Sequence, residues 1–131
     1  ESCFTKDATF HARKVLDNAV PDADFMVIEG RDAFIAGLRA IWQGLSATHH
    51  MLSNHVVTLA GDGHSAQGSC YMRAHHVGNR ERAHLFEESL GRFDFDLVRA
   101  GQEWKIRRMD ENIFIILGTE EAFENPVQAS G

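Results

Sequence analysis

The sequence predicts an α+β fold, in which a cone-shaped, curved antiparallel sheet has helices packed on its concave face. One amphipathic helical segment, at residues 32–45, is followed by four long strand-like segments that are separated only by short turns. Strands joined in this way form an antiparallel meander, and such a sheet needs a cover on one face. The chain has 131 residues, and we expect residues 1–131 to form a single domain.

The segments before the meander are two strands and the helix. Residues 7–13 alternate between polar and apolar types, residues 14–24 are loop-like, and residues 25–28 form a short apolar strand. The helix follows because its apolar residues recur with the 3.6-residue period of one helical face. That face consists of Phe34, Ile35, Leu38, Ile41, Trp42 and Leu45.

The four segments of the meander are rich in β-branched and aromatic residues, and glycine-containing turns separate them. In the third segment Phe86 and Leu90 stand at even positions, whereas Phe93 and Phe95 stand at odd positions. Regular alternation along a strand would place these two pairs on opposite faces of the sheet. A bulge near Gly91 would bring both sets to one face and would bend the sheet. The strands are expected at residues 48–60, 66–78, 83–99 and 103–117.

The ends of the chain give two further expectations. The sequence starts at Glu1 without an initiator methionine, and its first residues resemble the last turn of a helix, so we expect a helix to precede them. At the other end, residues 119–131 are expected to form a short helix or a loose tail.

The composition excludes several classes of protein. The formal net charge is −6 and the basic residues are scattered, so the chain lacks the basic patch of a nucleic-acid-binding surface. No segment approaches the roughly 18 apolar residues that a membrane-spanning helix needs. Cys3 and Cys70 form no spacing motif, which is typical of a reduced cytoplasmic protein. We therefore expect a cytoplasmic protein that binds neither nucleic acid nor membranes.

Histidines are the residues that point to chemistry, with eight in the chain. The alternation of a strand places His50 on one face with Leu52, Asn54 and Val56. Two imidazoles on adjacent strands of a concave face, His50 and His76, would suit acid–base chemistry near neutral pH. The spacing alone allows equally well that both are structural histidines of the core or rim. The face of His76 also carries Cys70, Met72 and Ala74.

Several short motifs follow one another in a fixed order: a helix, THHMLSN, a strand that ends in HH, GRFDFD and EWKI. In this order and spacing they resemble the SnoaL-like polyketide cyclase and scytalone dehydratase group of the nuclear-transport-factor-like superfamily, which has a cystatin-like fold. The resemblance covers residues 1–109. Each motif is short, and their order makes the resemblance specific.

The resemblance implies catalytic roles for two histidines. His50 and His76 take the positions of the two catalytic histidines of scytalone dehydratase, and His50 also matches that of a related dehydrochlorinase. By this resemblance His50 would remove a proton from an acidic C–H. His76 would donate a proton to the leaving hydroxyl, or hold a water that does, in a syn-type β-elimination. The substrate would be a small, hydrophobic, cyclic molecule, and we expect no metal and no cofactor.

The resemblance also implies a set of substrate-binding residues. His11 takes the position of a catalytic tyrosine in scytalone dehydratase, although a surface histidine on an edge strand is an equal alternative. Gly91 and Phe93 stand where that enzyme has polar residues, which predicts a more apolar pocket and a substrate other than scytalone. The expected substrate-binding residues are His11, Asn54, Met72, Ala74, Phe93, Phe95 and Met109.

Three other hypotheses stay open. A metal site formed by His11, His50 and His76 has no supporting ligand motif in the sequence. A noncatalytic role is the second, since the β subunits of aromatic-ring-hydroxylating dioxygenases share this fold and a similar strand. A small-ligand-binding domain is the third, because one fold serves many functions. An enzyme needs polar groups that converge in a water-poor pocket, whereas a subunit needs a broad apolar patch.

The apolar run at residues 113–117 has two interpretations. It is either a central strand that is buried on both faces or part of a dimer interface on the outside of the sheet, as in related proteins. We favour the interface and expect a homodimer or a higher homo-oligomer.

Overall fold

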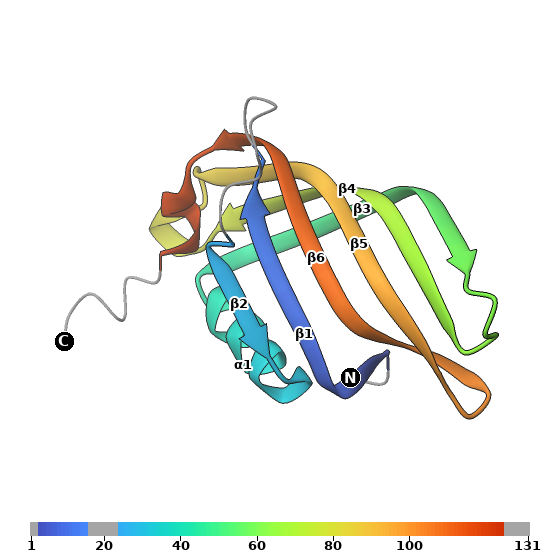
Figure 1. Ribbon diagram of the computed structural model, residues 1–131. Helices are drawn as coiled ribbons and strands as arrows, with labels where there is room; N and C mark the ends of the chain where they lie inside the picture. Colours follow the sequence, from blue (N-terminus) through green and yellow to red (C-terminus); the bar gives the residue numbers. More distant parts are fainter. Residues whose placement is uncertain (1–2, 16–23, 125–131) are drawn as a thin grey trace.

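The structure, a computed structural model, describes residues 3–15 and 24–124, which form one six-stranded sheet and one α-helix (Figure 1). The elements in chain order are β1 (Phe4–Lys14), β2 (Met26–Glu29), α1 (Arg31–Trp42), β3 (Leu45–Leu59), β4 (Ser65–Gly78), the 3₁₀ turn η1 (Arg80–Arg82), β5 (Phe86–Ala100), β6 (Glu103–Gly118) and the 3₁₀ turn η2 (Glu120–Phe123). The strand order across the sheet is β2-β1-β6-β5-β4-β3. Strands β3 to β6 are the predicted antiparallel meander.

One strand pair departs from the antiparallel prediction, since β1 and β6 run parallel. Strands β1 and β2 form an antiparallel pair, and α1 then carries the chain to the other edge of the sheet, where β3 starts the meander. The last meander strand therefore returns beside β1 in the same direction. The predicted α+β class with a curved sheet is confirmed, and the other four strand pairs of the described sheet are antiparallel.

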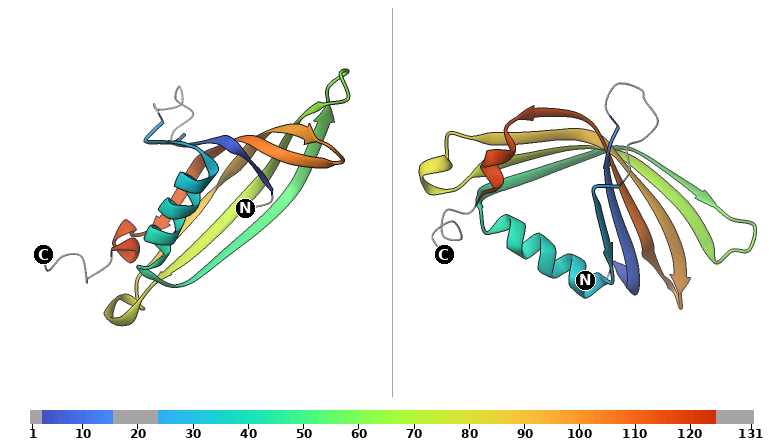
Figure 2. Two further views of the ribbon diagram at one scale, coloured as in Figure 1. Left: turned by 90° about the horizontal axis from the view of Figure 1, so that it is seen from below. Right: turned by 60° about the vertical axis from the view of Figure 1, so that its left-hand side comes forward.

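Helix α1 lies under the arch of the sheet (Figure 2). Phe34 of the helix stacks on Phe10 of β1 with ring centroids 3.5 Å apart, and Phe4 contacts both rings edge-on. The helix ends at Trp42, before the predicted Leu45, because Leu45 already belongs to β3. We call the face of the sheet that carries Phe10 and α1 the inner face, and the opposite one the outer face.

Some sequence expectations concern the margins of the described structure. The short helical segment expected within residues 119–131 is η2, and residues 125–131 lie outside the described part. Of the loop expected at residues 14–24, Lys14 belongs to β1, and residues 16–23 again lie outside. No helix in the described part of the chain has both the length and the apolar character needed to cross a membrane.

The register between β5 and β6 is irregular next to Gly91, where the bulge was expected. Leu90 pairs with Ile115 but Gly91 pairs with Ile113, so the extra residue is Phe114 and the bulge lies in β6. The backbone of β6 approaches so closely there that a Cβ atom on Gly91 would overlap the carbonyl oxygen of Asn112. Glycine is therefore required at this position by the path of β6.

Because the bulge lies in β6, strand β5 keeps one continuous register with β4 from Phe86 to Val98. The expectation that Phe86 and Leu90 join Phe93 on the inner face is wrong. Both point to the outer face, and the alternate residues Glu87 and Ser89 point inward, since neighbouring strand residues face opposite sides.

A second bulge interrupts β3. Ser53 pairs with Tyr71 and Val56 with Ser69, so Asn54 and His55 together face one residue of β4. Asn54 has a positive φ of 53°, in the left-handed region that asparagine tolerates better than most residues. The bulge reverses the alternation, so Val56 does not share the face of His50 as expected.

Candidate active site

Five polar residues of β3, β4 and β5 lie together on the inner face. Thr48 pairs with His76, and His76 pairs with Glu87 on its other side, so these three form one row across the sheet. His50 and Ser89 belong to the next row, where they lie on either side of Ala74 of β4. The turn η2 covers this end of the sheet, because the ring of Phe123 lies 5.0 Å from that of His76.

The two predicted catalytic histidines converge. The ring centroids of His50 and His76 are 5.3 Å apart, and their planes cross at 70°. Between them, Oγ1 of Thr48 lies 2.8 Å from Nδ1 of His76 and 3.5 Å from Nδ1 of His50. A hydroxyl group carries one proton, so Thr48 can donate to one of the two rings and must accept from the other.

The surroundings of the pair favour neutral imidazoles. The side chain of His76 is only 8% exposed, and burial, followed by the neighbouring His50 and His75, lowers its pKa to about 4. Partial burial, followed by His49, also lowers the pKa of His50, although this residue is open to solvent. Both rings are therefore neutral at pH 7, and each can accept a proton.

Glu87 is a site residue that the sequence did not reveal. It is 3% exposed, its Oε1 accepts a short hydrogen bond from Oγ of Ser89, and its Oε2 lies 3.8 Å from Nε2 of His76. No hydrogen-bond donor in the described residues reaches Oε2. Burial raises the pKa of this carboxyl group, and the hydrogen bond from Ser89 opposes that effect. Glu87 was missed because the apolar neighbours Phe86 and Leu90 were expected to face inward.

Glu111 is a second, partly buried carboxyl group on the inner face. It lies in β6 between Phe93 of β5 and Ala12 of β1. Burial, followed by the negative charge of Glu87, raises the pKa of Glu111 to about 7. A signal for it was present in the sequence, since Glu111 is two residues from Met109, which was expected to face the pocket.

The apolar residues expected to line a pocket form the floor beside the polar rows. Met72, Ala74 and Phe93 are buried in one cluster with Cys70 and Ile113. Burial, followed by Asp94, raises the pKa of the Cys70 thiol, so this cysteine is not an activated nucleophile. The residues packed against the cluster are Phe95, Met109 and Ile116.

Two expected binding residues lie elsewhere. His11 alternates with the inward-facing Phe10, so it points to the outer face, where its Nδ1 is 2.7 Å from Oδ2 of Asp24. It cannot share a pocket or a metal ion with His50 and His76, which corrects the expectation from the sequence. In residues 3–15 and 24–124, no three His, Cys, Asp or Glu side chains are placed to hold a metal. The other residue, Asn54, lies in the exposed bulge of β3.

The site is open along the edge strand β3. The side chains of this strand beyond Leu45 are exposed, and Leu52 has 46% of its surface accessible. The described residues thus provide a floor and one covered end. They leave the candidate site open along β3.

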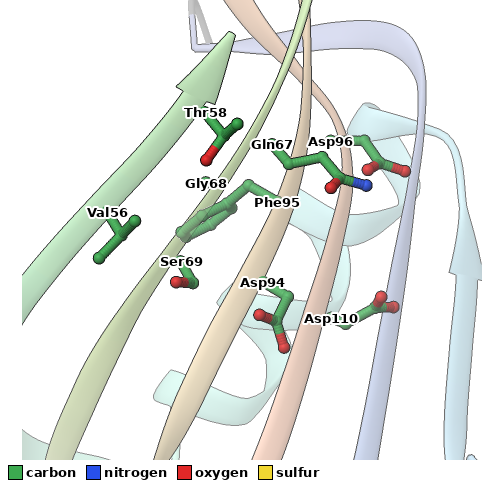
Figure 3. Close-up of a pocket in the computed structure, with 9 residues that line it drawn as sticks. All are labelled: Val56, Thr58, Gln67, Gly68, Ser69, Asp94, Phe95, Asp96 and Asp110. Atoms are coloured by element: carbon green, nitrogen blue, oxygen red, sulfur yellow. The ribbon is translucent and has the colours of Figure 1, made fainter. Parts of the chain in front are cut away.

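A groove of about 420 Å³ lies on the outer face, away from the histidines (Figure 3). Two of its three carboxylates already have partners, since Asp94 accepts hydrogen bonds from Arg92 and Asn112, and Asp110 from Arg108. We therefore place the candidate site at the histidines. The groove is lined by Val56, Thr58, Gln67, Gly68, Ser69, Asp94, Phe95, Asp96 and Asp110.

Solved structures of known proteins share this fold. A candidate scytalone dehydratase from Novosphingobium aromaticivorans has a TM-score of 0.72 at 20% identity, over 96% of this chain and 76% of that one. A hexachlorocyclohexane dehydrochlorinase has a TM-score of 0.68 at 10% identity, over 95% and 76%. The β subunit of a candidate aromatic-ring-hydroxylating dioxygenase from N. aromaticivorans has a TM-score of 0.65 at 13% identity, over 87% and 73%. At these identities the likeness shows the fold alone.

A comparison with curated proteins found no significant match. The family model of the SnoaL-like domain matches residues 1–110, which is most of the sequence. The match includes β1 to β5, the helix and the first half of β6, and thus His50, His76 and Glu87. The chain belongs to the SnoaL-like domain family.

Proposed function

We propose that the protein is a dehydratase that removes water from a small, hydrophobic, cyclic substrate by acid–base chemistry of His50 and His76. The observation that carries this proposal is the convergence of two neutral imidazoles on one hydroxyl group, beside an apolar floor. Similar folds in a candidate scytalone dehydratase and a dehydrochlorinase support elimination as the reaction class.

The contacts around Thr48 support one assignment of the two roles. Nε2 of His76 faces the carboxylate of Glu87, which favours the tautomer with a proton on Nε2. Nδ1 of His76 must then accept the proton of Thr48, and Thr48 accepts from Nδ1–H of His50. Nε2 of His50 is left as a lone pair, and this atom is the base.

This order gives a balanced elimination. Nε2 of His50 takes the proton from the substrate C–H, the C–H electron pair forms the C=C bond, and the C–O bond breaks. Nδ1–H of His50 passes to Thr48, the Thr48 proton passes to Nδ1 of His76, and Nε2–H of His76 protonates the departing hydroxide. The 3.5 Å step from His50 would shorten with substrate bound, as catalytic hydrogen bonds often do. Both rings end neutral with exchanged tautomers.

A panel of cyclic β-hydroxy ketones tests the proposal, with the absorbance of the conjugated product as the readout. A parallel experiment in D₂O follows deuterium exchange at the acidic carbon, which reports on the base alone. We expect His50→Ala and His76→Ala each to lower kcat/KM by about 100-fold or more. His49→Ala is the matched control, because His49 neighbours His50 but points to the outer face. Full turnover in both variants, or neither elimination nor exchange with any compound, would disprove the proposal.

We also propose a homodimer that forms through the outer face. Ile115 and Leu117 of β6 point to that face and are 49% and 48% exposed, so the alternative of a strand buried on both faces does not hold. Phe86 extends the apolar surface. A noncatalytic subunit role would use this same surface to bind a different chain, as the likeness to a dioxygenase β subunit suggests. A homodimer of the purified chain favours the first proposal.

The proposed location is the cytoplasm. Cys3 and Cys70 are both free, one exposed and one buried, and free thiols are typical of a reducing compartment. Fractionation of cells that express the full-length protein tests this, and recovery outside the cytoplasm would contradict it.

A further inference from the structure

We propose that Glu87 and His76 together hold a hydroxyl group of the ligand, so that the site selects neutral cyclic alcohols over the corresponding ethers and carboxylates. The inference builds on the proposed function for the position of the ligand. It adds that Glu87 and His76 recognise the ligand, and that they select alcohols.

One carboxylate oxygen of Glu87 has no hydrogen-bond donor among the described residues. The residue is 3% exposed, and Ser89 occupies Oε1 while Oε2 has no donor among the described residues. A buried acceptor without a partner is unfavourable, and native proteins normally satisfy it with protein, water or ligand. A ligand that brings an O–H group would supply the missing donor.

The distance between Glu87 and His76 leaves room for one oxygen atom that contacts both side chains. Oε2 and Nε2 are 3.8 Å apart, which is too far for a direct hydrogen bond. The distance suits two groups that both contact one oxygen atom at about 2.8 Å. That oxygen would accept Nε2–H of His76 and donate its own hydrogen to Oε2 of Glu87. A hydroxyl group can do both, whereas an ether oxygen can only accept.

The carboxylate of Glu87 is held in a fixed position beside His76. Glu87 lies between His76 on β4 and Gly118 on β6. Ser89, two residues along the same face, holds one carboxylate oxygen in place. Phe123 covers the His76 ring, so a ligand reaches the pair from the side of the apolar floor.

The charges around the site disfavour anions. The nearby ammonium group of Lys14 is already paired with Glu120 at 2.7 Å. Glu111 adds a second, partly buried carboxyl group on the same inner face. A carboxylate ligand would therefore meet Glu87 and Glu111 with no free cation among these groups, whereas a neutral alcohol meets no such repulsion.

Binding of three fluorescent probes tests this without any need for turnover. The probes are 2-naphthol, 2-methoxynaphthalene and 2-naphthoate, which share one ring system and differ in the polar group. We expect the wild-type protein to bind 2-naphthol about 10-fold or more tightly than either of the others at pH 7. In Glu87→Ala the preference for the alcohol over the ether should disappear. In the isosteric Glu87→Gln, which keeps the shape of the site, binding of 2-naphthoate should improve.

Two further variants separate this inference from the proposed function. Glu88→Gln is the matched control, because Glu88 is the next residue, is buried, and points to the outer face toward Arg73 and His75. His50→Ala should lose turnover yet keep the preference for 2-naphthol, so a failure of catalysis leaves this test intact. The inference is wrong if no probe binds or if the wild type shows no preference for 2-naphthol. It is also wrong if Glu87→Ala keeps the preference for 2-naphthol over 2-methoxynaphthalene, or if Glu87→Gln does not improve binding of 2-naphthoate.

Discussion

The hydroxyl group of Thr48 lies 2.8 Å from Nδ1 of His76, within hydrogen-bond distance of this ring nitrogen. We predict that Thr48→Val, which removes the hydroxyl group but keeps the shape, leaves His76 in a mixture of tautomers. It should also lower elimination by about 10-fold to 100-fold, since the proton relay is broken. Histidine ¹⁵N chemical shifts report the tautomer directly.

Two controls accompany this prediction. Thr48→Ser keeps the hydroxyl group and should preserve both the tautomer and the rate within a few fold. Thr58→Val makes the same change on the same strand at the outer-face groove and should have no effect on His76. A single, unchanged His76 tautomer in Thr48→Val would show that Thr48 does not order the pair.

The buried His76 predicts a loss of stability in acid. Its pKa is lowered from 6.5 to about 4 in the folded state, so the unfolded state binds the proton more tightly between these values. The free energy of unfolding should therefore be highest above pH 6.5 and fall toward pH 4, by on the order of 3 kcal/mol. Urea unfolding at several pH values measures it, and His76→Gln should flatten the profile. His84→Gln, at an exposed position, should leave the profile as it is.

Glu111 predicts the opposite pH dependence. Its pKa is raised from 4.5 to about 7, so the folded state holds the proton more tightly, and the stabilisation present below pH 4.5 is lost as the pH rises through 7. Glu111→Gln should therefore raise the free energy of unfolding at pH 8 by on the order of 3 kcal/mol, and much less at pH 4.5. Glu81→Gln, at an exposed position, is the control. An equal gain at both pH values would point to packing and not to the charge.

The exposed apolar residues on the outer face of β6 predict that substitutions there change the mass of the protein assembly in solution. If Ile115 and Leu117 form the dimer interface, the double substitution Ile115→Asp and Leu117→Asp should convert a dimer into a monomer, because buried carboxylates are costly. Light scattering after size exclusion measures the mass. Val57→Asp, at a 61% exposed position of the edge strand β3, should leave the mass unchanged. A wild-type monomer at micromolar concentration would contradict the interface.

The sequence was sufficient for the fold class and the strand faces wherever alternation is unbroken. His50, Met72, Ala74 and His76 lie on the inner face as expected, because no bulge separates them within β3 or β4. Prediction failed where a bulge changed the register. Such an irregularity depends on the contact between two strands, and residue types along one strand do not encode which strand carries the extra residue.

The same reason explains why the carboxyl groups were missed. Glu87 was missed because a bulge was expected to bring Phe86 and Leu90 to the face of Phe93, yet the continuous pairing of β5 with β4 turns Glu87 inward. His11 was placed by resemblance alone, and its neighbour Phe10, which packs against Phe34, shows that it faces outward. Charged residues on an inner face are rare, so their burial follows from register and not from residue type.

The bulge opposite Gly91 sets the register of β6, and it therefore also decides which residues of β6 face the candidate site. A Cβ atom at this position would overlap the carbonyl oxygen of Asn112, so Gly91→Ala must push β6 away or remove the bulge. We predict a loss of about 2 kcal/mol or more in the free energy of unfolding. Gly61→Ala is the matched control, since a Cβ atom there meets no atom within 4 Å and the stability should change little.

If the bulge were lost without unfolding, every β6 residue on one side of Phe114 would move to the opposite face. Glu111 and Met109 could then no longer share the inner face with Ile116. The Gly91→Ala variant should accordingly lose the raised pKa of Glu111, which ¹³C carboxyl shifts across a pH titration would reveal. A stable Gly91→Ala protein in which Glu111 still titrates near pH 7 would show that the strand accommodates the methyl group elsewhere. That outcome would contradict the prediction that Gly91 keeps Glu111 on the inner face.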